Sequence, residues 1–182
     1  MNKNMNKVKL FEYSKIIGKE NISFGEYIII DDFTFIYAKN SMIIGNYVHI
    51  AAFTSIVVRE KIVLEDFVNI SHGCRIFSCS DDFKNKGFGN PTIDDRFRNI
   101  FSCPIIIKKF AIIGANSVIL PGITIGEGVA VGANSVISKD LEPWGIYINN
   151  KKVGERNKEE IMKNYELFLN SQVSERVGKL FK

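Results

Sequence analysis

Two neighbouring stretches of the sequence carry side chains that can accept a proton near neutral pH. The chain has only two histidines, His49 and His72, and His72 is our first candidate for a general base because imidazole titrates in this range. Asp81 and Asp82 follow shortly after it. Either carboxylate could orient the imidazole, or act as the base itself if burial raised its pKa. This set is suited to deprotonating a hydroxyl or amine that attacks a carbonyl carbon. The alternative is two surface histidines and a solvated acidic turn.

The acidic pair opens a long irregular segment that runs from Cys79 to Pro104. A disordered insertion would be poor in aromatic residues, and long loops inside compact folds are usually functional. We therefore expect a lid or a binding loop here. Its charged residues include Asp81, Asp82, Asp94, Asp95, Arg96 and Arg98, and its phenylalanines are Phe83, Phe88, Phe97 and Phe101.

On both sides of this segment the sequence repeats itself. The stretches that begin at Phe24, Ile44 and Leu64 align at a period of 20, and the stretch from Ile107 repeats from Ile125 at a period of 18. Within each unit a large apolar residue returns every six positions, which is neither a helical period nor a simple strand alternation. The pattern predicts an all-β solenoid whose short strands meet at tight corners and stack a continuous core.

The repeat shows which residues need a separate explanation. Cys74 falls in an inward column, as a small core residue would. His72 stands where earlier coils have Asp32 and Ala52. Coil geometry therefore does not require a histidine there, which favours a functional role for His72.

The repeat also divides the chain. We expect an N-terminal leader over residues 1–21, with at most one strand or partial coil, and a solenoid over 22–148 with the inserted loop at 79–104. A C-terminal extension follows at 149–182. Asn157 and Glu160 have the spacing of a capping box, and the apolar residues after them predict a helix over 158–180. It would cover the open end of the solenoid or pack on a neighbouring subunit.

Composition narrows the classes of protein. The net charge of +4 is too small to indicate a nucleic-acid partner, and no stretch is long and apolar enough to predict a transmembrane segment. The N-terminus does not read as a secretory signal. Three cysteines without metal-ligand spacing indicate a reduced, cytoplasmic protein, and no metal is expected.

The segment IGANSVILPGITIGEGVAVGANSVISKDLEPWGIY, with FSCSDDF and GNPTIDD before it, resembles the hexapeptide-repeat acyltransferases. More narrowly, it is similar to their sugar and galactoside O-acetyltransferase-like branch. The resemblance covers roughly residues 22–158. It implies a left-handed parallel β-helix, a homotrimer, and acyl transfer from acetyl-CoA at clefts between adjacent subunits.

The same resemblance implies a cofactor site. In such enzymes the pantetheine arm passes the small residue after each coil glycine, the lysine of a Ser/Thr-Lys pair helps to hold cofactor phosphate, and a later basic residue meets the 3′-phosphate. In this sequence those positions are Gly114, Ala115, Gly132, Ala133, Ser138, Lys139 and Arg156, with Lys151–Lys152 as an alternative to Arg156.

The chain departs from that family in two places. The run from Ile148 to Lys152 lacks the usual proline. In the galactoside and xenobiotic branches the loop after Ile76 carries the catalytic histidine, whereas this chain has Ser80–Asp82 there. The general base is therefore open between His72, Asp81 and Asp82.

Our leading hypothesis is acetyl-CoA-dependent transfer of an acetyl group to a sugar hydroxyl in surface polysaccharide biosynthesis. The alternative is N-acetylation of a nucleotide-linked amino sugar, since a neutral amine needs less help from a base. A γ-type carbonic anhydrase needs three histidines on zinc, and this chain has two. A non-catalytic solenoid is the remaining class, and the long loop argues against it.

Overall fold

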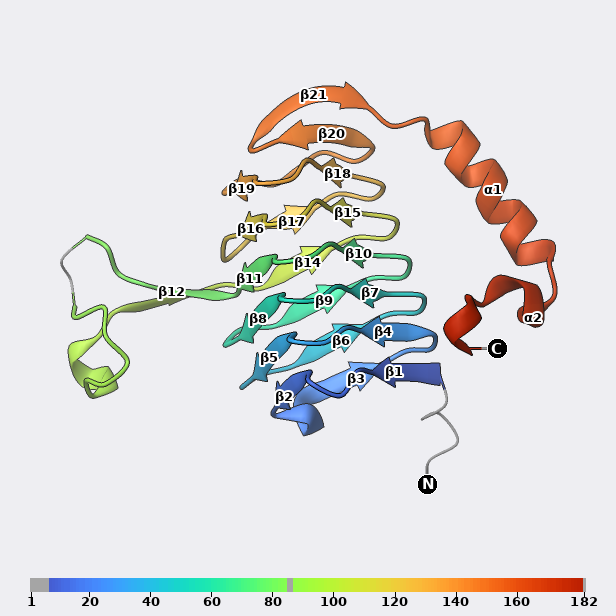
Figure 1. Ribbon diagram of the computed structural model, residues 1–182. Coiled ribbons are helices and arrows are strands. Elements are labelled where there is room, and N and C mark those ends of the chain that lie inside the picture. Colours follow the sequence, from blue (N-terminus) through green and yellow to red (C-terminus); the bar gives the residue numbers. More distant parts are fainter. Residues whose placement is uncertain (1–6, 85–86, 182) are drawn as a thin grey trace.

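The computed structural model describes residues 7–84 and 87–181, and these form a β-solenoid of about seven turns with a lateral loop and a C-terminal helical segment (Figure 1). The predicted all-β solenoid is confirmed. Three sheets form its sides, and in each sheet the strands of successive coils pair in parallel.

The three sheets, which we call A, B and C, follow one another along each coil. Sheet A consists of β1 (Val8–Leu10), β4 (Ile28–Ile30), β7 (His49–Ile50), β10 (Asn69–Ile70), β15 (Ile112–Ile113), β18 (Ala130–Val131), β20 (Gly145–Ile148) and β21 (Lys151–Glu155). Sheet B consists of β2 (Lys15–Ile17), β5 (Phe35–Ala38), β8 (Ser55–Val58), β11 (Arg75–Phe77), β16 (Val118–Ile119) and β19 (Val136–Ile137). Sheet C consists of β3 (Ile22–Phe24), β6 (Met42–Ile44), β9 (Ile62–Leu64), β14 (Ile105–Ile107) and β17 (Thr124–Ile125).

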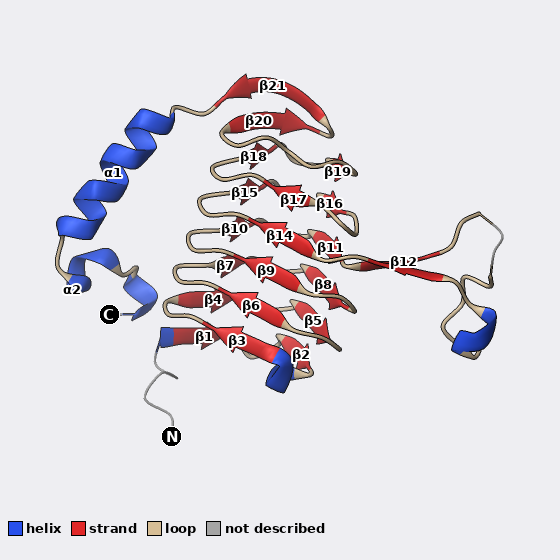
Figure 2. Cartoon of the chain, turned by 180° about the vertical axis from the view of Figure 1, so that it is seen from behind, coloured by secondary structure: helices blue, strands red, loops and turns tan. Residues whose placement is uncertain are grey.

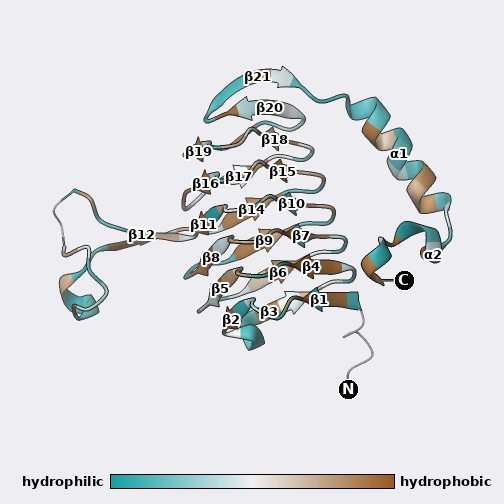
Figure 3. Cartoon of the chain, in the orientation of Figure 1, coloured by the Kyte–Doolittle hydropathy of each residue, from teal (hydrophilic) through white to brown (hydrophobic). Residues whose placement is uncertain are grey.

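Inward columns of apolar side chains form the core. Ile30, Ile50, Ile70 and Ile113 stack through paired strands, and all four are fully buried. Burying each such side chain contributes about 1.5–3 kcal/mol, and every coil supplies its equivalents to the column. Hydrophobic residues accordingly concentrate on the strands, while the corners carry more polar ones (Figure 3).

The corners need backbone conformations that side chains rarely adopt. At the corner between sheets C and A, which we call the CA corner, Tyr27, Tyr47, Phe67 and Phe110 all have φ between 57° and 63°. A bulky residue in this region is strained. Their rings stack at 4.9–5.2 Å between centroids, and such contacts offset part of the strain.

The C-terminal segment covers that aromatic ladder. Helix α1 (Lys158–Asn170) begins where predicted, because Asn157 Oδ1 accepts a hydrogen bond from the Glu160 amide. Phe168 packs edge-on against the rings of Tyr47 and Phe67. The helix thus lies along the CA corner and not over the open end, where β21 instead pairs antiparallel with β20 (Figure 1).

Two boundaries differ from those expected. The helix ends at Asn170, ten residues early, because Ser171 adopts an extended conformation and the Gln172–Glu175 pair caps a separate helix, α2 (Val173–Arg176). A 3₁₀ turn at Lys179–Phe181 follows. At the other end, β1 and β2 pair with β4 and β5, so the coils begin at Val8, inside the expected leader, and a 3₁₀ turn at Lys19–Asn21 joins them to β3.

Candidate functional site

The inserted segment leaves the solenoid at the corner between sheets B and C, the BC corner. Strands β12 (Cys79–Asp81) and β13 (Ile100–Ser102) form an antiparallel ribbon, and a 3₁₀ turn at Asp95–Phe97 lies near its tip. The ribbon projects sideways, on the opposite side of the solenoid from α1 (Figure 2). The segment therefore has regular secondary structure of its own, which lets it hold side chains in fixed positions as a binding loop must.

A pocket of about 610 Å³ lies along this ribbon. Its polar groups include both predicted carboxylates, and Asp82 Oδ2 accepts a hydrogen bond from Asn99 Nδ2 at 2.9 Å. Phe83, Ile100 and Phe101 supply apolar lining, so the pocket combines acceptors for hydroxyl or ammonium groups with an apolar surface. Its lining residues are Ser80, Asp81, Asp82, Phe83, Lys84, Asn99, Ile100, Phe101 and Ser102.

One arginine holds the ribbon together, and the sequence did not single it out. The Arg98 side chain is only 10% exposed and donates to Asp81 at 2.7 Å and to Asp95 at 3.0 Å. The hydrogen bond with Asp81 is the main cause of a raised Arg98 pKa. Such charge-assisted pairs fix geometry well. The only signal in the sequence was the alternation of acidic and basic residues in the loop.

His72 does not meet the acidic pair within the chain. It lies at the corner between sheets A and B, the AB corner, at the start of the turn that leads into β11, whereas Asp81 lies beyond the end of β11. The strand between them spans about 10 Å. The His72 imidazole is exposed, and the carbonyl of His72 accepts the Asn116 amide at 2.8 Å. A site that uses both groups would need parts of two corners.

The other histidine has a different environment. His49 Nε2 lies 2.9 Å from Asp31 Oδ2, and its Nδ1 lies 3.1 Å from Asn69 Oδ1 on the outer face of sheet A. Its two nitrogens therefore tie three successive coils together.

Four of the predicted cofactor residues lie in one column with His72. Gly114–Ala115 and Gly132–Ala133 occupy the AB corner of the next two coils, where the Ala115 carbonyl accepts the Asn134 amide at 2.8 Å. A Cβ on Gly114 would come within 2.6 Å of Val131 O and Ala133 N. Coil stacking alone therefore explains Gly114, while Ala115 is half-buried and Ala133 is exposed at the outer edge of the corner.

The remaining predicted cofactor residues lie at two other corners of the solenoid. Ser138 and Lys139 lie at the BC corner, where the Ser138 amide and hydroxyl each bond Asn150 at 2.9 Å and Lys139 is exposed. Arg156 is at the CA corner, where its Nη1 donates to Phe110 O at 2.8 Å and to Gly128 O at 2.9 Å. Burial lowers the pKa of Arg156. The structure thus does not place Arg156 with the other candidates.

The upper part of sheet B lies between the AB-corner column of candidate residues and the candidates at the BC corner. Arg75, Val118 and Val136 form an outward-facing column across β11, β16 and β19, with Val136 47% exposed. This face has the His72–Ala115–Ala133 column along one edge and the loop and Lys139 along the other. It can hold a long ligand with an apolar arm and a charged end.

The described residues also bear on two other possibilities, a metal site and a membrane-spanning helix. Within residues 7–84 and 87–181, no group of three or more His, Cys, Asp or Glu side chains is arranged to hold a metal ion. No helix in that part of the chain is both long and apolar enough to cross a bilayer.

Known proteins resemble the chain over most of its length. The sequence profile of the family described as bacterial transferase hexapeptide (six repeats) matches residues 104–139. The dTDP-4-amino-4,6-dideoxy-D-glucose acyltransferase of Escherichia coli is 34% identical over 154 residues, which are 83% of this chain and 80% of that protein.

Solved structures agree with the sequence matches. AntD, an N-acyltransferase from Bacillus cereus in complex with dTDP and 3-hydroxybutyryl-CoA, has a TM-score of 0.83 at 36% identity, over 90% of this chain and 89% of that one. A variant of AntD with dTDP-4-amino-4,6-dideoxyglucose and coenzyme A has a TM-score of 0.84 at 34% identity, over 90% and 88%. These matches confirm the predicted left-handed β-helix.

Proposed function

Because the chain belongs to the bacterial hexapeptide-repeat acyltransferases, we propose that it transfers an acyl group from acyl-CoA to the amino group of a nucleotide-linked amino sugar. The observation that carries this proposal is the identity of 34% across 83% of the chain with an acyltransferase whose named acceptor is such a sugar. The comparisons favour this alternative over the sugar hydroxyl of our leading hypothesis. A role in surface polysaccharide biosynthesis remains a prediction.

Acetyl-CoA or a related acyl-CoA is proposed to lie on the outer face of sheet B. Its pantetheine arm would pass Ala115 and Ala133, whose side chains are single methyl groups, and Lys139, which is exposed, would contact its phosphates. Small side chains at a corner let a ligand approach the backbone amides closely. The Arg156 Nη1 already serves two carbonyls at another corner, so Arg156 is not part of this arrangement.

The chemistry asks little of a general base. The amine nitrogen attacks the thioester carbon, the C–N bond forms, and the C–S bond breaks as the tetrahedral intermediate collapses. The proton lost by the nitrogen ends on the departing thiolate, directly or through His72. The exposed His72 at the donor corner is suited to this relay.

The carboxylates are proposed to bind the acceptor. Asp81 and Asp82 lie in the loop pocket beside Phe83 and Phe101, which suits a sugar with polar groups on one side and an apolar face on the other. Asp81 is held by Arg98, so its position is fixed before the acceptor arrives.

A homotrimer is part of the proposal. Within one chain His72 and the loop pocket lie at opposite ends of β11, whereas a cleft between two subunits could join a corner of one to the loop of the other. Light scattering of the purified protein measures this directly, and a monomer that is fully active would contradict it.

The function is tested by comparing two acceptors. Release of free CoA thiol is followed with acetyl-CoA and either dTDP-4-amino-4,6-dideoxyglucose or dTDP-glucose, which has hydroxyls only. We expect release with the amino sugar and background release with dTDP-glucose. Equal or faster release with the hydroxy sugar would overturn the proposal, as would no release with any amino sugar nucleotide.

A further inference from the structure

A second aromatic ladder runs along the AB corner of the first three coils. Tyr13 stacks on Phe33 at 5.6 Å between centroids and Phe33 on Phe53 at 5.1 Å, with ring planes 8° and 10° apart. All three side chains are more than half exposed, at 61%, 56% and 58%. The ladder at the CA corner is covered by α1, but no described element covers this one (Figures 1 and 2).

The ladder stops at Phe53 because the next coil has Gly73 at this position, with φ of 71°. The Asn116 side chain of the coil above occupies the space beside Gly73 where a side chain would begin, so the aromatic stack gives way to a polar contact there. Phe53 is thus the last aromatic ring of the ladder, and it lies one coil below His72.

A cation is held against the backbone of Phe53, the last aromatic residue of the ladder. Arg75 Nη1 donates to the carbonyls of Phe53 and Gly73, both at 2.7 Å, and to that of Cys74 at 3.0 Å. Among the described residues, Arg75 Nε and Nη2 have no acceptor, and the side chain is exposed. The protein therefore fixes the guanidinium through one nitrogen and leaves its other donors to solvent.

We propose that Phe53 and Arg75 bind the nucleotide half of the acceptor, with the base stacked on Phe53 and the diphosphate on the free donors of Arg75. This inference rests on the proposed function. Aromatic rings bind bases by stacking, and a guanidinium pairs with phosphate oxygens. Ala115 lies two coil spacings above Phe53, about 10 Å, so the sugar would extend from Arg75 toward the donor, where the loop of an adjacent subunit of the proposed trimer would supply Asp81 and Asp82.

The test compares the two ends of the ladder. Phe53→Leu removes the ring of the residue whose carbonyl Arg75 binds, and Tyr13→Leu removes a similarly exposed ring two coils away. We expect Phe53→Leu to raise the KM for the amino sugar nucleotide about ten-fold or more, with the KM for acyl-CoA unchanged. Tyr13→Leu should leave both values unchanged, and Phe53→Trp should retain nucleotide binding.

Calorimetry separates this inference from the proposed function, because dTDP binding needs no turnover. Arg75→Gln should weaken dTDP binding but not thymidine binding, since only the former carries phosphate. If Phe53→Leu leaves the nucleotide KM and dTDP affinity unchanged while transfer proceeds, the inference fails and the function stands. If Phe53→Leu loses the oligomer but keeps its dTDP affinity, the ladder is a subunit contact and the inference is likewise overturned. Phe53-dependent dTDP binding without transfer would refute the function alone.

Discussion

Replacing Phe168 by alanine should release helix α1 from the solenoid. The ring makes edge-on contacts with Tyr47 at 5.0 Å and Phe67 at 5.3 Å, and aromatic pairs contribute about 0.5–1.5 kcal/mol each. Tyr165 on the same helix makes the other two ring contacts with the solenoid, with Phe67 and Phe110, so Phe168 supplies half of the four aromatic contacts that attach α1 within the described part of the chain. A loss of about 2 kcal/mol raises the detached population about thirty-fold.

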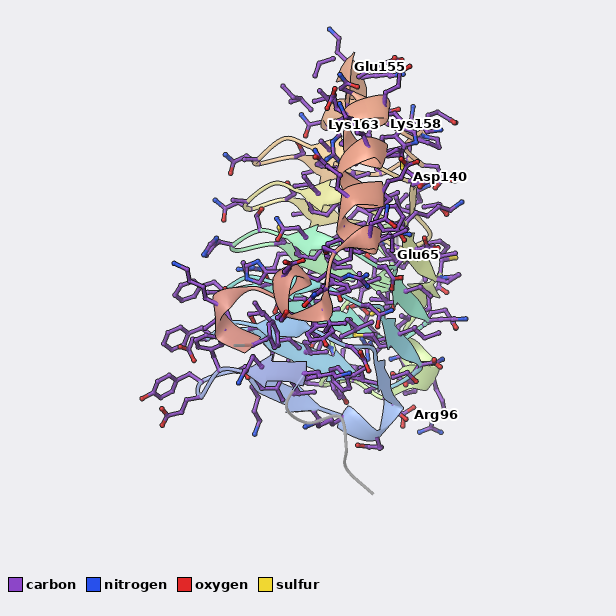
Figure 4. All side chains as sticks on the ribbon, turned by 90° about the vertical axis from the view of Figure 1, so that its right-hand side faces the viewer. Glu65, Arg96, Asp140, Glu155, Lys158 and Lys163 are labelled. Atoms are coloured by element: carbon purple, nitrogen blue, oxygen red, sulfur yellow. The ribbon has the colours of Figure 1, made fainter. Side chains whose placement is uncertain are left out.

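Limited trypsin digestion measures that population. Lys158 and Lys163 lie on α1 (Figure 4), and cleavage there needs local detachment. Leu167→Ala is the matched control, because Leu167 lies on the same helix and is 63% exposed. This variant should be cleaved at the wild-type rate. Transfer kinetics should not change, since α1 and the sheet B face lie on different sides. Equal cleavage of the two variants would refute the ring-contact account.

Three further predictions concern the site. His72→Gln should lower kcat about ten-fold or more with the KM for acyl-CoA unchanged; an unaltered kcat would show that His72 relays no proton. Arg98→Leu should raise the KM for the acceptor and speed proteolysis of the loop, because Asp81 loses its partner. Arg96→Leu should do neither, because the ion pair of Arg96 with Asp94 is exposed. Similar behaviour of the two variants would contradict the role of Arg98. Burial raises the pKa of the Cys79 thiol, so alkylation of Cys79 should begin only above the pH at which a free thiol reacts. The stability that the buried neutral thiol contributes should be lost as the pH rises past the ordinary pKa of a thiol. Alkylation of Cys79 as fast as that of a free thiol at neutral pH would refute this.

The fold was predictable because each inward position is repeated in the neighbouring coil. Ile30, Ile50 and Ile70 recur at a period of 20, and the register of parallel strands follows from it. The aromatic ladders had the same signal, since Tyr27, Tyr47 and Phe67 share that period. That signal could have shown where α1 docks.

The site was less predictable because it depends on irregular segments. His72 and Asp81 are close in sequence, yet β11 separates them. The pairing of Asp81 with Arg98 spans 17 residues of loop without a repeat. Arg156 follows β21, where the antiparallel turn ends the coil period, so its position at the CA corner could not be extrapolated.

The bond formed in the product tests the central claim most directly. Acetyl-CoA is incubated with the enzyme and dTDP-4-amino-4,6-dideoxyglucose, and the product is analysed by mass spectrometry before and after mild alkali, which hydrolyses esters but leaves amides intact. We predict a single added acetyl group that survives the treatment. An acetyl group that alkali removes would show O-acylation and contradict the account.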